Sequence, residues 1–293
     1  MKLGIVYPQN ELSGDPGSLG RVAQAVEAMG YDHLVLYDHV VGAVHEGRDP
    51  PLNGPYTQHD QFIDPFAAFA YLAALTRTLK FVTGVLILPQ RQTVLVAKQA
   101  ADVDLLSHER LRLGVGTGWN YVEYQALGED FHTRGRKIDE QIVYLRRLWR
   151  EEAFSFEGDF HTLERGNLVL RPRRQIPIYV GGFVEAAYRR AARLGDGFIF
   201  VMNRADPLDD WTRLKAMLGE EGRSVEGFGA QFIASRGERH QFETPELVET
   251  ALRLREAGAS ELSINSAGRG FTEEQQHFDY FAEAKAKLDA ALR

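Results

Sequence analysis

Short apolar runs alternate with longer stretches whose apolar positions recur at helical spacing, and this alternation extends along the whole chain. The runs have the length and the β-branched and aromatic content of buried strands. We expect strands at residues 3–7, 33–37, 80–88, 111–115, 176–180, 198–201, 228–235 and 261–265. Most are followed by a helical stretch, so the strands are expected to be parallel. Eight such units favour a closed TIM (β/α)8 barrel over an open sheet.

The helical stretches have recognisable ends in several places. Asp64 and Pro65 are expected to be the N-cap and first residue of a helix that runs to residue 76. Gly195 ends the helical run that begins near Phe183. The remaining helices are expected at residues 19–29, 94–106, 134–151, 211–218, 245–257 and 278–292.

Insertions are expected after the second and fourth strands. The segment that follows the second strand, to about residue 62, is rich in Gly, Pro, His and Asp and has no period. A loop of that length in a compact domain is usually functional or disordered, and we expect it to form a lid over a site. Residues 154–163 predict a small exposed hairpin. No internal linker is visible, so residues 1–293 are expected to form one domain.

The unit around residues 176–201 contains a glycine pair, Gly181 and Gly182, between its first strand and its helix. Adjacent glycines can adopt backbone angles that side chains forbid, and they leave the first N–H groups of the helix accessible. Such a turn can bind an anion such as a phosphate. The glycine pair alone is equally compatible with a turn that binds nothing.

Composition excludes some classes of partner. The formal net charge is −7, so no basic face for nucleic acid or anionic lipid is expected. The chain has no cysteine, which excludes disulfides and thiolate metal sites. No apolar run approaches the roughly 20 residues of a membrane span, and the first residues have too short an apolar core for a signal peptide. We therefore expect a cytoplasmic protein.

Polar residues and glycines stand where several strands end: Asp38 and His39, Thr83 and Gly84, residues 116–119, Gly181 and Gly182, and Asn203 with Arg204. In a barrel of this kind the carboxyl ends of the strands form the working face, so these residues should converge on one mouth. His39 could donate or accept a proton, and Asp38 could orient the imidazole or a ligand. The alternative is a capping Asp beside a packed His.

Three further residues are candidates with plain structural alternatives. Trp119 could form the wall for a flat aromatic ligand, or pack in the core. Glu123 could face the same way, or lie on a solvated helix face. Arg204 could hold an anionic group of a substrate, although a lone Arg in a loop is more often solvated.

The histidines do not have the spacing of a metal site. No His-x-His or His-Glu-x-x-His pattern is present, and we expect no catalytic metal. Five histidines in polar sequence surroundings are expected at the surface: His108, His132, His161, His240 and His277.

Taken together, the strand-end motifs resemble the luciferase-like monooxygenase superfamily, and within it the branch of F420-dependent oxidoreductases. The similarity extends over essentially the whole chain and rests on four motifs in order: residues 37–41 (Tyr-Asp-His-Val-Val), 83–86 (Thr-Gly-Val-Leu), 114–119 (Gly-Val-Gly-Thr-Gly-Trp) and 180–197, with Val-Gly-Gly, Arg-Arg-Ala-Ala and Gly-Asp-Gly.

The resemblance implies a TIM-type barrel with a flavin or the deazaflavin coenzyme F420 at its mouth. Asp38 would contact the tricyclic ring, and His39 would exchange the proton beside the carbon that takes part in hydride transfer. Gly84 and Val85 would form a strand bulge, often with a cis peptide, that supports the ring. Backbone amides of Gly181, Gly182 and Phe183 would bind the cofactor phosphate.

The resemblance also has a departure and leaves alternatives. Members that oxidise sugar phosphates have a Glu where this chain has Trp119, which argues against that substrate class, while Arg204 stands where those members have a substrate-binding Lys. We expect a hydride transfer between F420 and an unidentified organic substrate. The alternatives are an FMN-dependent two-component monooxygenase, served by a separate reductase, and a barrel that binds the cofactor without catalysis. The resemblance suggests a homodimer.

Overall fold

Eight parallel strands close into a barrel in the computed structural model of the chain, which describes residues 1–12, 14, 15, 17–202, 206–235 and 242–293. β3 pairs with both β2 and β5, and β1 pairs with β11, so the ring of strands is complete. The strands are β1 (Lys2–Val6), β2 (His33–Leu36), β3 (Lys80–Thr83), β5 (Leu111–Gly116), β8 (Ile178–Gly181), β9 (Gly197–Val201), β10 (Gly229–Ala234) and β11 (Glu261–Asn265). The TIM barrel expected from the alternating pattern is confirmed.

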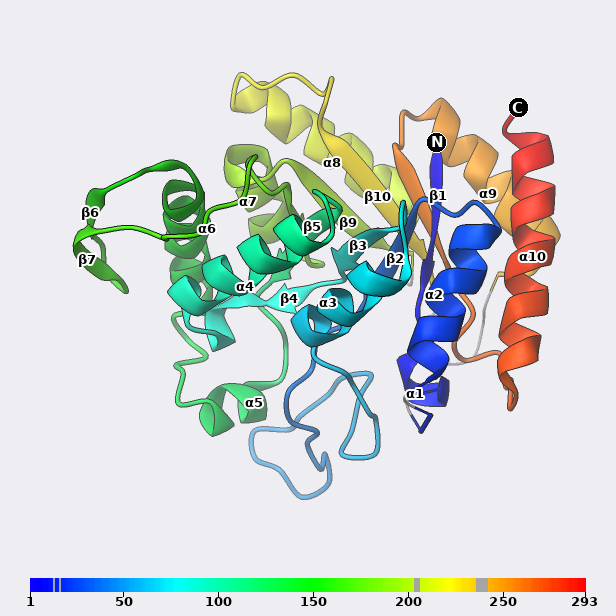
Figure 1. Cartoon of the computed structure of the whole chain (residues 1–293), viewed down its shortest axis with the longest axis horizontal. Helices are drawn as coiled ribbons and strands as arrows, with labels where there is room; N and C mark the ends of the chain where they lie inside the picture. Colours follow the sequence, from blue (N-terminus) through cyan, green and yellow to red (C-terminus); the bar gives the residue numbers. More distant parts are fainter. Residues whose placement is uncertain (13, 16, 203–205, 236–241) are drawn as a thin grey trace.

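Helices surround this barrel, with α2 and α10 lying side by side (Figure 1). They are α1 (Gln9–Leu12), α2 (Ser18–Ala28), α3 (Pro65–Leu75), α4 (Thr93–Leu106), α5 (Tyr121–Ala126), α6 (Arg134–Arg150), α7 (Glu185–Leu194), α8 (Pro207–Glu220), α9 (Thr244–Glu256) and α10 (Glu274–Ala291), with a short 3-10 helix at Leu88–Gln90. None of the described helices is both long and apolar enough to cross a membrane.

Both insertions lie where they were expected. The segment of residues 37–64 contains neither helix nor strand and extends from the barrel below α3 in Figure 1. The insertion after β5 contains α5 and α6, and after them β6 (Phe154–Glu157) and β7 (Thr162–Gly166) form an antiparallel hairpin that projects from the barrel. The Asp64 side chain accepts hydrogen bonds from the N–H groups of Phe66 and Ala67, which confirms it as the N-cap of α3.

Two helices start earlier than the apolar pattern predicted. α8 begins at Pro207, four residues before Trp211, because Asp206 caps it by accepting a hydrogen bond from the Leu208 N–H. α10 begins at Glu274, where Glu273 and Gln276 form a reciprocal capping box. The first turns of both helices are largely polar, so an apolar period does not reveal them.

The barrel interior is apolar in its middle and polar at the end where the strands begin. Its centre is a cluster of Val6, Val35, Val82, Tyr179, Ile199 and Ile233. Near the strand starts, His33 Nε2 lies 2.8 Å from Ser263 Oγ, and the buried Arg112 pairs with Glu261. These side chains occupy the barrel interior at that end, so we expect a ligand at the opposite end, where the strands finish.

Candidate active site at the carboxyl ends of the strands

The floor of the barrel mouth is formed by residues from three neighbouring strand ends. The Val85 side chain packs against the interior cluster and lies over Gly116 and Gly181. A Cβ on either glycine would come within 2.6 Å of a Val85 methyl group, so both positions need the absence of a side chain. The Gly84–Val85 peptide is cis, and β4 (Leu86–Ile87) continues the line of β3 beyond it. Residues that are far apart in the sequence therefore meet at one place.

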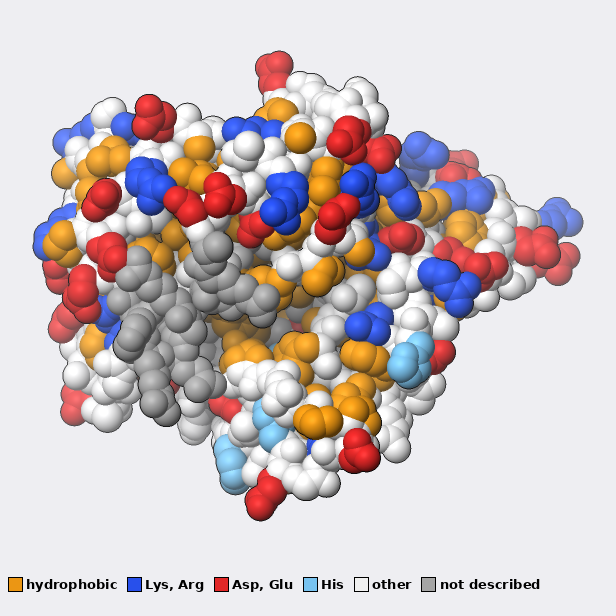
Figure 2. Space-filling model, turned by 180° about the vertical axis from the view of Figure 1, so that it is seen from behind, with side chains coloured by type: hydrophobic (Ala, Val, Ile, Leu, Met, Phe, Trp, Pro, Cys, Tyr) orange, Lys and Arg blue, Asp and Glu red, His pale blue; other side chains and the backbone are white. Residues whose placement is uncertain are grey.

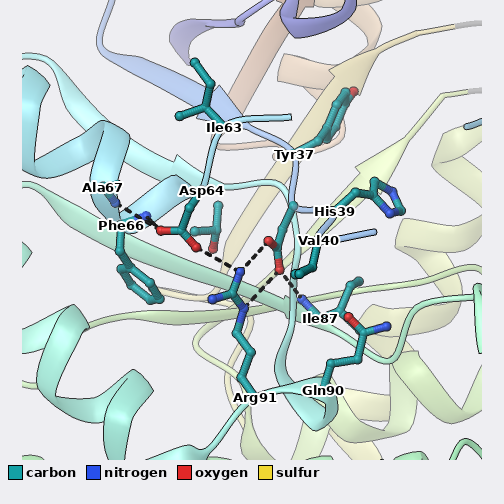
Figure 3. A network of polar contacts seen from close by, with 12 residues as sticks. Tyr37, His39, Val40, Ile63, Asp64, Phe66, Ala67, Ile87, Gln90 and Arg91 are labelled. Carbon is teal, nitrogen blue, oxygen red and sulfur yellow. Dashed lines mark hydrogen bonds and ion pairs between the residues drawn. The ribbon is translucent and has the colours of Figure 1, made fainter. Parts of the chain in front are cut away.

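Asp38 lies at the end of β2 with its carboxylate turned toward Arg91. Arg91 Nη2 donates to Asp38 Oδ1 at 2.7 Å, and the Ile87 N–H donates to Oδ2 at 3.1 Å. The same guanidinium donates to Asp64 Oδ2 at 3.0 Å. The Asp38 side chain is 1% exposed and that of Arg91 is 16% exposed, so this is a largely buried ion pair. Figure 3 shows Arg91 beside Asp64, with the His39 ring pointing away from it.

His39 is held by Glu123, which comes from α5. The imidazole Nδ1 lies 3.2 Å from Glu123 Oε2 and 3.3 Å from Oε1. Glu123 Oε1 also accepts from the N–H groups of Val40 at 2.8 Å and Val41 at 3.2 Å. Burial raises the pKa of the Glu123 carboxyl, but the hydrogen bonds from His39 and the two N–H groups outweigh it, so the pKa lies below its ordinary value. Glu123 is therefore a buried carboxylate at neutral pH.

Aromatic rings surround the other side of His39. The His39 ring centroid lies 4.9 Å from that of Tyr56, 4.8 Å from Phe62 and 6.0 Å from Trp119. Trp119 is covered by the insertion, because a Cβ on Gly54 would lie 2.2 Å from its ring. The segment of residues 37–64 thus packs over the residues of the mouth.

A cleft of about 350 Å³, part of it open to solvent, lies beside these rings. Its lining includes His39, Tyr56, Phe62, Asp60 and Asn120, and the described lining contains neither Lys nor Arg. Most of this space is open to solvent: the cavity itself is about 70 Å³, well below the volume of sites that enclose a drug-sized molecule. Figure 2 shows that the face behind the view of Figure 1 is hollowed and bordered by apolar side chains.

The insertion is closed at its base by two side chains. Gln9 donates to the Tyr37 carbonyl at 3.0 Å and accepts from the Ile63 N–H at 3.1 Å, so it joins the backbone at both ends of the segment. Arg91 bridges the side chains of Asp38 and Asp64, the residues that follow Tyr37 and Ile63 in the sequence. We call Gln9 and Arg91 the base clasp. Neither residue was recognised from the sequence, because both partners of each are distant along the chain.

The glycine turn after β8 has a backbone conformation that requires glycine. Gly182 adopts a φ of +152°, a conformation that side chains rarely adopt, and a Cβ there would lie 2.8 Å from the Ala187 Cβ. α7 starts three residues after Gly182 with no side-chain cap among the described residues, and Phe183 and Val184 are exposed just before it. A helix end of this kind leaves backbone N–H groups for a phosphate. These residues fit the phosphate end of a flavin or F420.

Several other residues named in the sequence analysis do not lie where they were expected. Glu123 was expected near the substrate, and it lies buried behind His39 instead. Arg204 lies outside the described residues. Two histidines expected at the surface are not there: His161 is hydrogen-bonded to Glu140 and Thr93, and His277 is fully buried. Among the described residues no group of three or more His, Asp or Glu could hold a metal ion.

The fold brings these residues together at the carboxyl ends of the barrel strands, which is where enzymes with a TIM barrel have their active sites. Residues 1–286 match the family of luciferase-like monooxygenases. The chain belongs to this family.

Curated relatives within the family use two cofactors. An uncharacterized protein of Mycobacterium tuberculosis is 36% identical over 220 residues, 74% of this chain and 76% of the relative. An F420-dependent glucose-6-phosphate dehydrogenase of Nakamurella multipartita is 28% identical over 211 residues, 69% of this chain and 57% of the relative. An FMNH2-dependent dimethylsulfone monooxygenase of Pseudomonas fluorescens is 32% identical over 182 residues, 61% of this chain and 46% of the relative.

The fold also matches a solved structure over almost its full length. The structure of an F420-dependent secondary alcohol dehydrogenase in complex with an F420–acetone adduct superposes with a TM-score of 0.79 at 17% identity, covering 98% of each chain. The protein is therefore an oxidoreductase or monooxygenase of the luciferase-like family.

Proposed function

We propose that the protein transfers a hydride between coenzyme F420 and an organic substrate, with His39 exchanging the accompanying proton. The observation that carries the proposal is the placement of His39 at the mouth, with Nδ1 engaged by the buried Glu123. No hydrogen bond joins His39 Nε2 to another residue of the described chain, so this nitrogen can face a substrate in the cleft.

Each part of the mouth would have a separate task. The floor at Val85 would support the tricyclic ring, and the turn at Gly181, Gly182 and Phe183 would bind the phosphate. When bound, F420 supplies two-electron hydride chemistry at its central ring. His39 would take the hydroxyl proton of an alcohol substrate as the substrate carbon loses its hydride, or return it in the reverse direction. The insertion would exclude water from this step.

The contacts that Asp38 and Trp119 make in the structure are compatible with part of the roles predicted for these two residues. Asp38 keeps its carboxylate on Arg91, so it would approach the ring from a fixed position. Trp119 lies beside His39 beneath the insertion and would form a wall of the substrate cleft. A contact between Trp119 and the tricyclic ring of the cofactor stays a prediction. Arg204 stays a candidate for an anionic substrate group.

An FMN-dependent two-component monooxygenase is the second candidate function. It is favoured by the similarity to the FMNH2-dependent dimethylsulfone monooxygenase of Pseudomonas fluorescens. In that case a separate reductase would supply the reduced flavin. A barrel that binds the cofactor without turning it over is a third candidate. We also propose that the protein acts in the cytoplasm as a homodimer.

Titration of the purified protein with F420 and, separately, with FMN separates these candidates. We expect saturable changes in absorbance and fluorescence with F420 at lower concentration than with FMN. Tighter binding of FMN, together with oxygen consumption when reduced FMN is supplied, would replace the proposal by the monooxygenase. Tight binding without turnover over a broad panel of alcohols, aldehydes and ketones would favour the non-catalytic barrel. His39→Gln should retain cofactor binding and lose turnover.

A further inference from the structure

We propose that Glu123 is a positioning residue that fixes His39 as the Nδ1–H tautomer and so assigns proton exchange to Nε2. This inference concerns the same site and rests on the proposed function for its catalytic meaning. The structural part can be tested on its own, because it concerns only residues of this chain.

The tautomer follows from which atoms can donate. A carboxylate has no proton to offer, so every group within hydrogen-bonding distance of it has to donate. Glu123 is 1% exposed and His39 12% exposed, which excludes water from most of this contact. With Nδ1 at 3.2 Å from Oε2, the neutral imidazole must carry its proton on Nδ1. The lone pair of Nε2 is then directed away from Glu123.

Both oxygens of Glu123 lie within reach of Nδ1, Oε2 at 3.2 Å and Oε1 at 3.3 Å, but their other partners differ. Oε1 accepts from the N–H groups of Val40 and Val41, the residues that follow His39 in the insertion. Oε2 faces the imidazole and also accepts from Gln90 Nε2 at 3.4 Å. One carboxylate therefore orients the imidazole and holds the start of the insertion. The neighbouring carboxylate of Asp38 is paired with Arg91 and does not compete for the imidazole.

This division makes Glu123→Gln an informative variant. The amide oxygen can replace Oε1 and keep both backbone contacts, while the NH2 group takes the place of Oε2 and faces Nδ1. An NH2 group donates, so an Nδ1–H at 3.2 Å would face another N–H group. Although the amide oxygen would remain 3.3 Å from Nδ1, the clash between the two donors favours Nδ1 as the acceptor and the proton on Nε2. The substitution is thus expected to preserve the insertion and to reverse the tautomer of His39.

Multiple-bond 1H–15N correlation spectra of 15N-histidine-labelled protein measure the tautomer without cofactor or substrate. The His39 signals are identified by their loss in His39→Gln. We expect Nδ1–H in the wild type near neutral pH, Nε2–H in Glu123→Gln, and the wild-type pattern in Asp60→Asn, which removes another carboxylate from the same cleft. An Nε2–H tautomer in the wild type would overturn the inference even if no variant folds. An unchanged tautomer in Glu123→Gln would overturn it as well.

Kinetics connect the tautomer to catalysis. With a substrate that the wild type turns over, Glu123→Gln should lower kcat by about 100-fold to 10,000-fold, because replacing the carboxylate that sets the tautomer of a catalytic imidazole by an amide can cost about 10,000-fold in a Ser-His-Asp triad. KM should change little, since the backbone contacts of the insertion are kept. A normal kcat with a reversed tautomer would refute the catalytic role of the positioning. If neither F420 nor FMN binds the wild type, the proposed function fails, and the tautomer measurement still decides the role of Glu123 as a positioning residue.

Discussion

Replacing Arg91 by Met should destabilise the protein strongly, because it leaves the Asp38 carboxylate buried without its counter-charge. Removal of one partner from a buried ion pair typically costs about 3–5 kcal/mol. Protonation of the carboxylate limits this loss to about 4 kcal/mol, the free energy needed to neutralise an ordinary aspartate at pH 7. The Ile87 N–H remains a partner of Asp38. We therefore expect a loss of about 3 kcal/mol in the free energy of unfolding.

A matched pair on the surface provides the control. Asp206 caps α8 and is paired with Arg253, just as Asp64 caps α3 and is paired with Arg91, but the side chains of Arg253 and Asp206 are 52% and 40% exposed. Arg253→Met should cost less than about 1 kcal/mol, as exposed ion pairs generally do.

Urea unfolding at pH 7, followed by circular dichroism, measures both losses from the shift of the midpoint. Adding Asp38→Asn to Arg91→Met should recover part of the stability, because the amide keeps an acceptor for the Ile87 N–H and carries no charge. Equal losses for Arg91→Met and Arg253→Met would refute the reasoning, and so would the absence of any recovery in the double variant.

Three other outcomes are expected. Gly182→Ala should weaken cofactor binding about tenfold in a fluorescence titration, because it strains the turn proposed to bind the phosphate and brings a Cβ against Ala187. A variant that binds the cofactor as tightly as the wild type would exclude this turn from the binding site. Glucose 6-phosphate should reduce F420 at least about tenfold less efficiently than an uncharged alcohol in kcat/KM, because Trp119 stands where the family members that oxidise sugar phosphates have a Glu. Burial lowers the pKa of His277 to about 4 from its ordinary 6.5, so the stability that the neutral imidazole provides is complete above pH 6.5 and is lost as the pH falls through 4. In His277→Gln the unfolding midpoint should depend less on pH in this window, and an unchanged pH profile would contradict this origin.

The barrel and the positions of its mouth residues could be predicted from the sequence because both are local features. Each strand is a short apolar run, and the residue that follows it lies at the working face by the geometry of the fold. The cap at Asp64 also has a local signature, whereas the special backbone at Gly84 and Val85 was expected from the family resemblance. The local features depend on a few neighbouring residues, so no knowledge of distant contacts was needed to find them.

The partners of these residues could not be predicted in the same way. Glu123 and His39 are 84 residues apart, and nothing in the sequence around Glu123 shows that its carboxylate is buried. Arg91 looks like an ordinary charged residue after a turn, yet it bridges two aspartates that are 26 residues apart. His277 has polar sequence neighbours, but its place on α10 turns it toward β11, where Ser266 Oγ lies 2.8 Å from Nδ1. Pairing of this kind is set by the packing of separate elements.

The base clasp makes the insertion a separable unit of the molecule. Because Gln9 and Arg91 tie together the two points where residues 37–64 leave and rejoin the barrel, we expect the chain between those points to have little influence on how the strands close. Sequence changes in residues 43–61 can then accumulate in evolution without disturbing the ring of strands. A laboratory graft of another loop between the same two anchor points should likewise be tolerated, and it offers a route to new substrate preferences on an unchanged scaffold.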